Sequence, residues 1–558
     1  MNKRKVVAAL LVLGLVGSVF AGCGSKSNSS TGEANKPAVE QKLVLPEGAL
    51  KTLDSVKGTD TVSFDAIQNT QETLLVYNNN KPEPGAAKTF DVSADGLTYT
   101  FHLRDGLKWS DGKALTANDF KYAWLRMLAK DTAAAYSFFL YSVVGGQDYN
   151  AGKVTADKVG ITAPDDKTFV VKLANPVPYF TQIAAFPGLS PEREDNVTAQ
   201  GDKYGTDATK MVYSGPFTVS EWQVGAKFIL KKNPNYWNAS AIKMETIELP
   251  YIKELATRYQ MFTNKQLDAM GGSGEYLAPL QQGSKDGKWN QVTGFEASVF
   301  YDQFNLDAAK AQKALQSPKV RLAFSLAEDR ENFVSKVLKR SKAAYGLVPP
   351  TLAAGDKIYR DALSGSEPLK AAATANPDPK ALFVQGLKDL GLDTDTSKYT
   401  FKYLLQASDA QTKTWAEFMQ NAWQTKLGVK IEIVPSADFS DFLTKQNNGE
   451  FDICTAGWGA DYNDPKTFLD LFGVDNGNNT GKYNNAKVNS LLDQLKTETD
   501  NAKRIDIYKQ LEQIEVVDDP AVVPTYYRDV QSFQAKKIHG LQLPLFGGTY
   551  SFRWTSVE

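Results

Sequence analysis

The residues best suited to hold a charged ligand gather in one short segment, GWGADYNDP, at residues 457–465. Asp461 supplies a carboxylate close to the large aromatic side chain of Trp458, and Gly457 and Gly459 loosen the backbone around them. The segment follows an apolar run at residues 451–454 that is typical of a buried strand. A carboxylate in such a place can pair with an ammonium group, which is costly to take out of water without a partner.

The same aspartates also have an ordinary structural interpretation. Residues 466–469 look helical, so Asp461 can form the preceding turn or cap the helix. Asp464, just before Pro465, is expected to be the cap itself. Trp458 can equally be a plain core aromatic side chain.

Catalytic chemistry has little support in the residue types. The chain has two histidines, His102 and His539, and neither has a second histidine or a cysteine at metal-ligand spacing. No G-x-S-x-G motif marks a serine nucleophile, and the glycine-rich segment 271–274 lacks the lysine of a phosphate-binding loop. Cys454 lies in the apolar run and is expected to be a buried small hydrophobic residue. We therefore expect neither an enzyme nor a bound metal or cofactor.

Length and charge narrow the class of protein. A chain of 558 residues is long enough for two to four domains, and its net charge of −1 with no long charged block disfavours a nucleic-acid partner.

Residues 1–22 combine three early basic residues with a short apolar stretch, which predicts a secretory signal. The segment FAGC at residues 20–23 resembles a bacterial lipobox, which implies lipidation at Cys23; an ordinary signal peptide with an incidental cysteine is the alternative. Residues 23–42 would then be a lipidated cysteine and a flexible tether.

The rest of the chain mixes strand and helix patterns. Alternating apolar side chains predict strands at residues 97–103 and 167–173, and a hairpin at 216–230. Thr116 and Asp119 resemble a capping box at the start of a helix, and Ser317-Pro318 begins another. The fold class is therefore α/β or α+β, in several parts.

Several segments resemble one family in order along the chain, the oligopeptide-binding lipoproteins, which are the extracytoplasmic solute-binding proteins of peptide ABC importers. The matching segments are residues 95–113, 115–120, 215–217, 232–237, 320–330, 457–465 and 523–527. The resemblance covers about residues 43–558. It implies a two-lobed, hinged α/β fold of the periplasmic-binding-protein type with an extra subdomain in lobe I. Lobe I would take residues 43–72, 205–298 and 524–558, the subdomain 73–204, and lobe II 299–523.

By this resemblance, Asp461 pairs with the α-ammonium of a bound peptide. Gly457 lies against the peptide backbone, Trp458 flanks the first ligand residues, and Gly459, Ala460 and Tyr462 complete the loop. The opposite side of the cleft maps to Thr59, Asp60 and Thr61. Some relatives carry an arginine at the position of Thr455 and a disulfide-bonded cysteine at the position of Gly459. How the carboxyl end of a peptide is held is therefore open.

The resemblance implies a receptor that captures oligopeptides and delivers them to the permease subunits of an ABC importer, without a cofactor. The expected protein is a monomer, anchored by lipid to the outer face of the cytoplasmic membrane, either at the cell surface or in a periplasm. The first alternative is the same fold with another cargo: a dipeptide, a signalling peptide, a sugar oligomer, a nickel chelate or haem. A structural cell-surface protein is the second, and it would need neither a hinge nor a charged cleft.

Overall fold

The computed structural model describes residues 39–474 and 476–558. Cys23, the predicted signal segment and most of the predicted tether lie outside these residues. Residues 41–558 form one compact unit, whose first strand, β1, begins at Lys42, the last residue of the predicted tether. Within the described ranges, no helix is both long enough and apolar enough to cross a bilayer.

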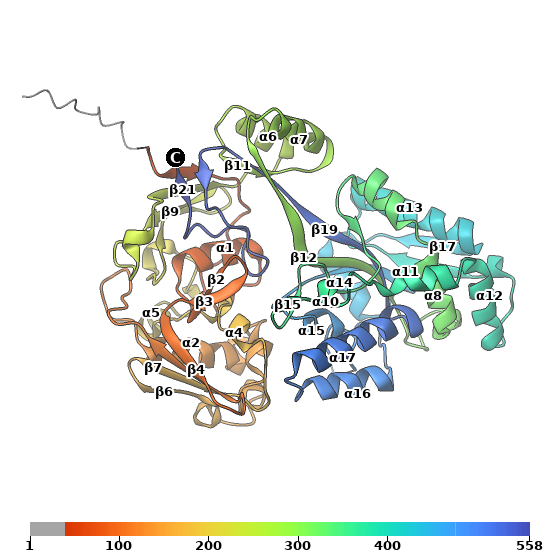
Figure 1. The fold of residues 1–558 in the computed structure, drawn as a ribbon, viewed down its shortest axis with the longest axis horizontal. Helices are drawn as coiled ribbons and strands as arrows, with labels where there is room; N and C mark the ends of the chain where they lie inside the picture. Colours follow the sequence, from red (N-terminus) through yellow and green to blue (C-terminus); the bar gives the residue numbers. More distant parts are fainter. Residues whose placement is uncertain (1–38, 475) are drawn as a thin grey trace, which may run out of the picture. The chain divides into compact units, whose positions relative to one another are not determined.

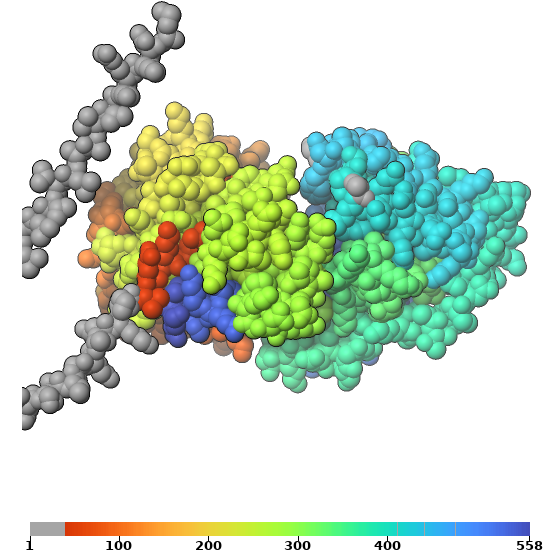
Figure 2. Space-filling model, turned by 90° about the horizontal axis from the view of Figure 1, so that it is seen from above, coloured from red at the N-terminus to blue at the C-terminus, as the bar shows by residue number. Residues whose placement is uncertain are grey.

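One four-stranded sheet brings the two ends of this unit together. Its order is β1 (Lys42–Val44), β10 (Thr246–Pro250), β9 (Lys227–Lys232) and β8 (Phe217–Gln223), with only β1 and β10 parallel. The predicted hairpin at residues 216–230 is confirmed by the β8–β9 pair. Gln41 donates a hydrogen bond of 2.8 Å from Nε2 to the carbonyl oxygen of Val557, so the red N-terminal and blue C-terminal segments lie side by side (Figure 2).

A second four-stranded sheet has the order β4 (Ala87–Val92), β5 (Thr98–Leu103), β7 (Thr168–Lys172) and β6 (Ile161–Asp165), all antiparallel. Alternate side chains of β5 are buried, as the period of two predicts. Helix α2 (Ala117–Leu128) begins at a capping box between Thr116 and Asp119 and packs on β6 and β7. The core between them contains Phe101, Trp124 and Phe169.

The largest sheet has seven strands. Its order is β11 (Ala269–Gly271), β19 (Val522–Gln534), β12 (Asn290–Phe304), β18 (Ile453–Gly459), β16 (Thr400–Leu404) and β17 (Lys430–Val434), with β13 (Lys342–Ala343) also paired to β19. β16 runs parallel to both β17 and β18, whereas β12 is antiparallel to both β18 and β19. The carboxyl ends of β16, β17 and β18 therefore meet at one edge of the sheet.

Helices surround this sheet (Figure 1). Helix α8 (Pro318–Ala327) begins with the predicted Ser-Pro pair and contacts α12 (Pro379–Asp389) and α13 (Ala410–Leu427). Their core is aromatic, with Phe324, Phe383 and Trp423 buried. The other helices of seven or more residues are α1 (Thr61–Thr70), α5 (Glu194–Gln200), α6 (Leu255–Thr263), α7 (Leu277–Lys285), α11 (Pro368–Ala375), α14 (Phe439–Asn447), α16 (Ala486–Leu495) and α17 (Asn501–Gln513).

Short elements complete the fold. The helices are α3 (Gly146–Asn150), α4 (Phe180–Ile183), α9 (Arg330–Asn332), α10 (Tyr359–Ala362) and α15 (Lys466–Leu469). The strand pairs are β2 (Leu75–Asn78) with β3 (Lys81–Pro84), β14 (Ala353–Ala354) with β15 (Lys357–Ile358), and β20 (Ile538–His539) with β21 (Ser556–Val557).

Candidate functional site

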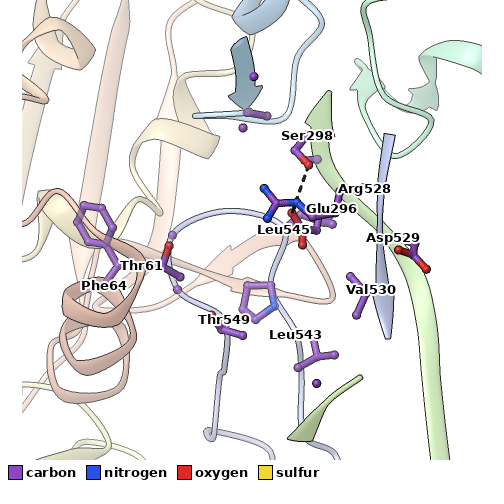
Figure 3. A pocket seen from close by; sticks show the side chains of 18 of the residues that line it. Thr61, Phe64, Glu296, Ser298, Arg528, Asp529, Val530, Leu543, Leu545 and Thr549 are labelled. Carbon is purple, nitrogen blue, oxygen red and sulfur yellow. Dashed lines mark hydrogen bonds and ion pairs between the residues drawn. The ribbon is translucent and has the colours of Figure 1, made fainter. Parts of the chain in front are cut away.

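A cavity of about 790 Å³ lies between segments that are far apart in the sequence. Figure 3 shows Thr61 and Phe64 of α1 on one side, and Glu296 and Ser298 of β12 with Arg528 and Val530 of β19 on the opposite side. The loop at residues 543–550 also lines it, with Leu543, Leu545 and Thr549 labelled. The volume is in the range of cavities that hold small ligands, about 300–1,000 Å³.

The edge where the three parallel strands end supplies another wall. Gln406 follows β16, Phe439 follows β17 and Asp461 follows β18, and all three line the cavity. Residues just beyond the carboxyl ends of neighbouring strands converge, which is why ligands of open α/β sheets bind there. The GWGADYNDP segment is thus the end of β18 and the loop after it.

The strand part of this segment is held by its neighbours. Gly457 lies opposite Phe300 on β12, and Gly459 lies opposite Ser298. A Cβ atom at Gly457 would lie 2.8 Å from Cδ1 of Phe300, so this ring requires the glycine. At Gly459 an added Cβ would meet no heavy atom within 4 Å, so the space there is open. The missing side chain of Gly457 is therefore explained by protein packing.

The loop that follows is also fixed. The Ala460 amide donates a 2.7 Å hydrogen bond to the carbonyl oxygen of Ala297. Thr467 Oγ1 accepts hydrogen bonds from the Asp461 amide at 3.2 Å and from Trp458 Nε1 at 3.4 Å. Trp458 is half-buried against the adjacent core and also lines the cavity. The backbone of Asp461 is thereby positioned without using its side chain.

The Asp461 carboxylate is half-buried, and no residue of the described ranges pairs with it by a hydrogen bond or an ion pair. Burial, with a smaller contribution from the Asp470 carboxylate, raises the pKa of Asp461 to about 7. The hydroxyl of Tyr136, another lining residue, has its pKa raised to about 12 by burial and by Asp461. An ammonium group entering the cavity would supply the missing partner of this carboxylate.

Of the nine ligand residues expected from the sequence, seven line the cavity: Thr59, Thr61, Gly457, Trp458, Gly459, Ala460 and Asp461. The other two lie elsewhere. Asp60 caps α1, with Oδ1 accepting from the Ser63 amide at 3.1 Å. Tyr462 is buried against Tyr179 and Phe139. Ligand contact by any of the nine stays a prediction.

The side chain of Asp464, the expected helix cap, binds two different elements. Pro465 rather than Asp464 is the N-cap of α15, although Asp464 Oδ1 accepts from the Lys466 amide at 3.0 Å. The same buried carboxylate also accepts from the Tyr508 hydroxyl at 2.5 Å and pairs with Arg504 at 3.3 Å. These contacts tie the loop to α17.

Sequence reasoning did not identify the charged residues that other elements contribute to the cavity. Arg258, Arg340, Arg528, Glu296 and Asp529 all line it. Arg528 and Asp529 directly follow the matched segment 523–527, so continuing that strand would have pointed to them. In the described part of the chain, no group of three or more His, Cys, Asp or Glu side chains is placed to hold a metal ion.

Comparisons with known proteins agree with this architecture. The profile of the bacterial extracellular solute-binding proteins, family 5 Middle, matches residues 81–480. The oligopeptide-binding protein OppA of Bacillus subtilis is 32% identical over 561 residues, covering 99% of each chain. A dipeptide-binding protein of Lactococcus lactis is 30% identical over 582 residues, covering 100% of each chain.

Solved structures show the same fold. The substrate-binding domain of an oligopeptide ABC transporter from Bacillus anthracis has a TM-score of 0.77 and 30% identity, covering 93% of this chain and 99% of its own. OppA of Listeria monocytogenes bound to peptide has a TM-score of 0.75 and 30% identity, with the same coverage of 93% and 99%. The predicted two-lobed α/β solute-binding fold is confirmed. The chain belongs to the bacterial extracellular solute-binding proteins of family 5.

Proposed function

We propose that the protein is an extracytoplasmic receptor that binds oligopeptides in this cavity and delivers them to the permease of an ABC importer. The printed names of its relatives support the proposal: the Bacillus subtilis relative is an oligopeptide-binding protein, and the Listeria monocytogenes structure holds a peptide. The Bacillus anthracis structure is the substrate-binding domain of an oligopeptide ABC transporter.

The observation that carries the proposal is the unpaired carboxylate of Asp461 in the cavity wall. Peptides differ in their side chains but share an α-ammonium, a backbone and a carboxylate. A receptor for many peptides must therefore bind the shared groups strongly and leave room for the rest. Asp461 is suited to the α-ammonium, because the pair would replace the water that both groups lose.

The arrangement of the sheets supports hinged capture. Apart from Lys42 at the start of β1, the strands of the first sheet fall in the segments assigned to lobe I, and those of the second sheet fall in the subdomain at residues 73–204. β12 and β19 contain the assigned lobe boundaries at residues 298/299 and 523/524, and they pair with each other. Two adjacent strands that cross between the lobes can act as a hinge, since a few residues at such crossings absorb domain closure. Peptide binding would then favour the closed form that the permease recognises.

The cellular setting follows from the first residues of the sequence. Lipidation at Cys23 would hold a monomeric receptor on the outer face of the cytoplasmic membrane, with residues 24–42 as the tether. Such an anchor would keep the cavity close to the permease on the side of the membrane where peptides arrive.

A thermal-shift titration of the purified protein tests the proposal. After unfolding and refolding to remove any retained ligand, one sample receives a pool of four- to eight-residue peptides and another receives the same pool N-acetylated. A ligand at one hundred times its dissociation constant stabilises a protein by about 2.7 kcal/mol, which gives a measurable shift. We expect stabilisation by the free pool alone. Equal stabilisation by both pools would keep peptide binding but remove the ammonium role of Asp461. No stabilisation by either would favour another cargo.

A further inference from the structure

Three arginines line the cavity, and two of them are already paired. Arg528 Nε lies 3.0 Å from Glu296 Oε2, a pair that the close-up in Figure 3 shows at the wall formed by β12 and β19. Arg340 Nε lies 2.7 Å from Asp529 Oδ1. The charges of these two guanidinium groups are therefore balanced by carboxylates of the protein.

Arg258 differs from the other two. It lies in the first turn of α6, and its Nε donates to the carbonyl oxygen of Ile252, which orients the side chain. No carboxylate of the described residues lies within 4.0 Å of its guanidinium, and neither terminal nitrogen donates to an acceptor in these ranges. Two nitrogens of a planar, half-buried fork are thus left for a ligand.

Glu47 and the Tyr550 hydroxyl interact electrostatically with Arg258, but neither forms an ion pair or a hydrogen bond with its guanidinium group. Glu47 and Asp65 form a buried carboxyl pair in which each has an oxygen without a hydrogen-bond partner in the described protein. Burial raises the pKa of Glu47, although Arg258 opposes the shift, and burial with the Glu47 charge raises the pKa of Asp65. Two carboxyl groups so close share a proton more readily than they both ionise.

We propose that Arg258 receives a carboxylate of the bound peptide, an inference that rests on the proposed function. One cavity then holds two unpaired opposite charges: the Asp461 carboxylate after β18 and the Arg258 guanidinium on α6. A peptide carries the complementary pair, an ammonium and a carboxylate. Arginine suits the second contact, because its fork donates two parallel hydrogen bonds to a carboxylate.

Arg258 also answers the question that Thr455 leaves open. Thr455 is neutral, so this position offers no cation to a carboxyl terminus. Its Oγ1 is buried and takes no partner in the described residues. The carboxylate that reaches Arg258 comes either from the carboxyl terminus or from an aspartate or glutamate side chain of the peptide. Both sources present the same group to the same fork.

Calorimetry with matched peptides separates these sources. The probes are peptides of three to eight residues without aspartate or glutamate, their C-terminally amidated twins, and amidated twins that carry one glutamate. For the peptide lengths that reach Arg258, amidation should weaken binding to the wild-type protein about tenfold or more. If the carboxylate comes from a side chain, the glutamate-containing twin should recover this loss. In Arg258→Gln both differences should shrink to less than about twofold.

Two variants keep the test decisive. Arg258→Lys retains the charge and should keep part of the discrimination, which a purely structural role would not produce. Lys253→Gln removes an exposed positive charge just before α6 and should discriminate as the wild type does. The inference is overturned if the wild type binds all three kinds of peptide equally, or if the amidation penalty survives in folded Arg258→Gln. If free peptides fail to bind at all, the proposed function fails first.

Discussion

The rings of Tyr179 and Tyr462 stack in parallel, with their centroids 4.2 Å apart and their planes inclined by 1°. Tyr462 directly follows Asp461, whereas Tyr179 directly precedes α4. Tyr462 also meets Phe139 edge-on at 6.2 Å and is 7% exposed. The side chain next to the candidate ligand carboxylate is therefore part of the hydrophobic core that the second sheet builds.

Tyr462→Ala should destabilise the protein and weaken peptide binding. Truncating a buried aromatic side chain costs about 3–5 kcal/mol, and the lost stack contributes to this. The Asp461 loop would also lose one of its anchors, so its carboxylate would spend less time in place. Urea unfolding and calorimetry with a free peptide measure the two effects.

Tyr462→Phe is the control, since it keeps the stacked ring and removes only the hydroxyl. It should retain most of the stability and most of the affinity. If Tyr462→Ala remains folded and binds peptide as tightly as the wild type, the stack does not position Asp461.

Two glycines on β18 provide a matched pair of substitutions. Gly457→Ala places a methyl group 2.8 Å from the ring of Phe300, which is itself stacked on Tyr526 at 4.7 Å, so the rings must shift. Such overpacking costs about 1–3 kcal/mol. Gly459→Ala meets open space and should leave the stability unchanged within about 0.5 kcal/mol.

Peptide affinity then separates packing from ligand contact. A weaker affinity in Gly459→Ala, measured by calorimetry in a protein of unchanged stability, would place a peptide against this side of the strand. Unchanged affinity would instead show that no ligand atom approaches Gly459. Gly457→Ala cannot make this distinction alone, because its effect on Phe300 alters the cavity wall.

Replacing Cys23 should release the protein from the membrane. A lipid chain gains about 0.8 kcal/mol for each CH₂ group that it buries, and the described residues contain no helix able to replace that anchor. In Cys23→Ala the protein should move to the soluble fraction after cell fractionation, while Ser25→Ala should stay with the membranes. A Cys23→Ala protein that still requires detergent for release would contradict lipidation at this residue.

Much of the local structure can be predicted from the sequence, because short-range rules govern it. The alternation in residues 97–103 becomes β5, and the pair Thr116 and Asp119 becomes the capping box of α2. Cys454 is buried, as its apolar neighbours predict. The location of the Asp461 loop at the cavity came from family resemblance, since the residues alone allow a cap or a turn.

Contacts between distant segments could not be predicted in the same way. Glu296 and Arg528 meet because β12 pairs with β19, a relationship that no local pattern reveals. Asp60 shows a different difficulty, which is that one residue type can serve two roles. Aspartate caps helices and also binds cations, and the Asp-x-x-Ser spacing from Asp60 to Ser63 serves the cap here. The choice between these roles depends on where the helix points.

Peptide affinity should depend on pH through Asp461. In the unliganded protein its pKa is about 7, and an ammonium pairs with the ionised form. Below pH 7, binding must first remove a proton, so affinity should fall about tenfold per pH unit and about a hundredfold by pH 5. Above pH 8 the peptide's own α-amino group, with a pKa of about 8, loses its charge, so affinity should fall again.

The stability of the unliganded protein should depend on pH in the opposite direction from peptide affinity over the acid range. The pKa of Asp461 is raised on folding from about 3.9, so between about pH 4 and pH 7 the folded protein keeps a proton that the unfolded chain releases. The contribution of Asp461 to the stability of the unliganded protein therefore decreases as the pH rises through this range. Asp461→Asn cannot titrate and should raise the Tm more at pH 8 than at pH 4.

Calorimetry from pH 5 to 9 with one free peptide measures how affinity depends on pH. Asp461→Asn is the control for other titrating groups. The groups that face Asp461 are the Asp470 carboxylate, which is ion-paired with Lys466, and the Tyr136 hydroxyl. Asp461→Asn should bind weakly, because neither neighbour replaces its negative charge in the cavity. Its affinity should no longer fall as the pH is lowered below 7. A wild-type affinity that stays constant between pH 5 and pH 7 would mean that Asp461 is already ionised, or that it does not meet the ammonium.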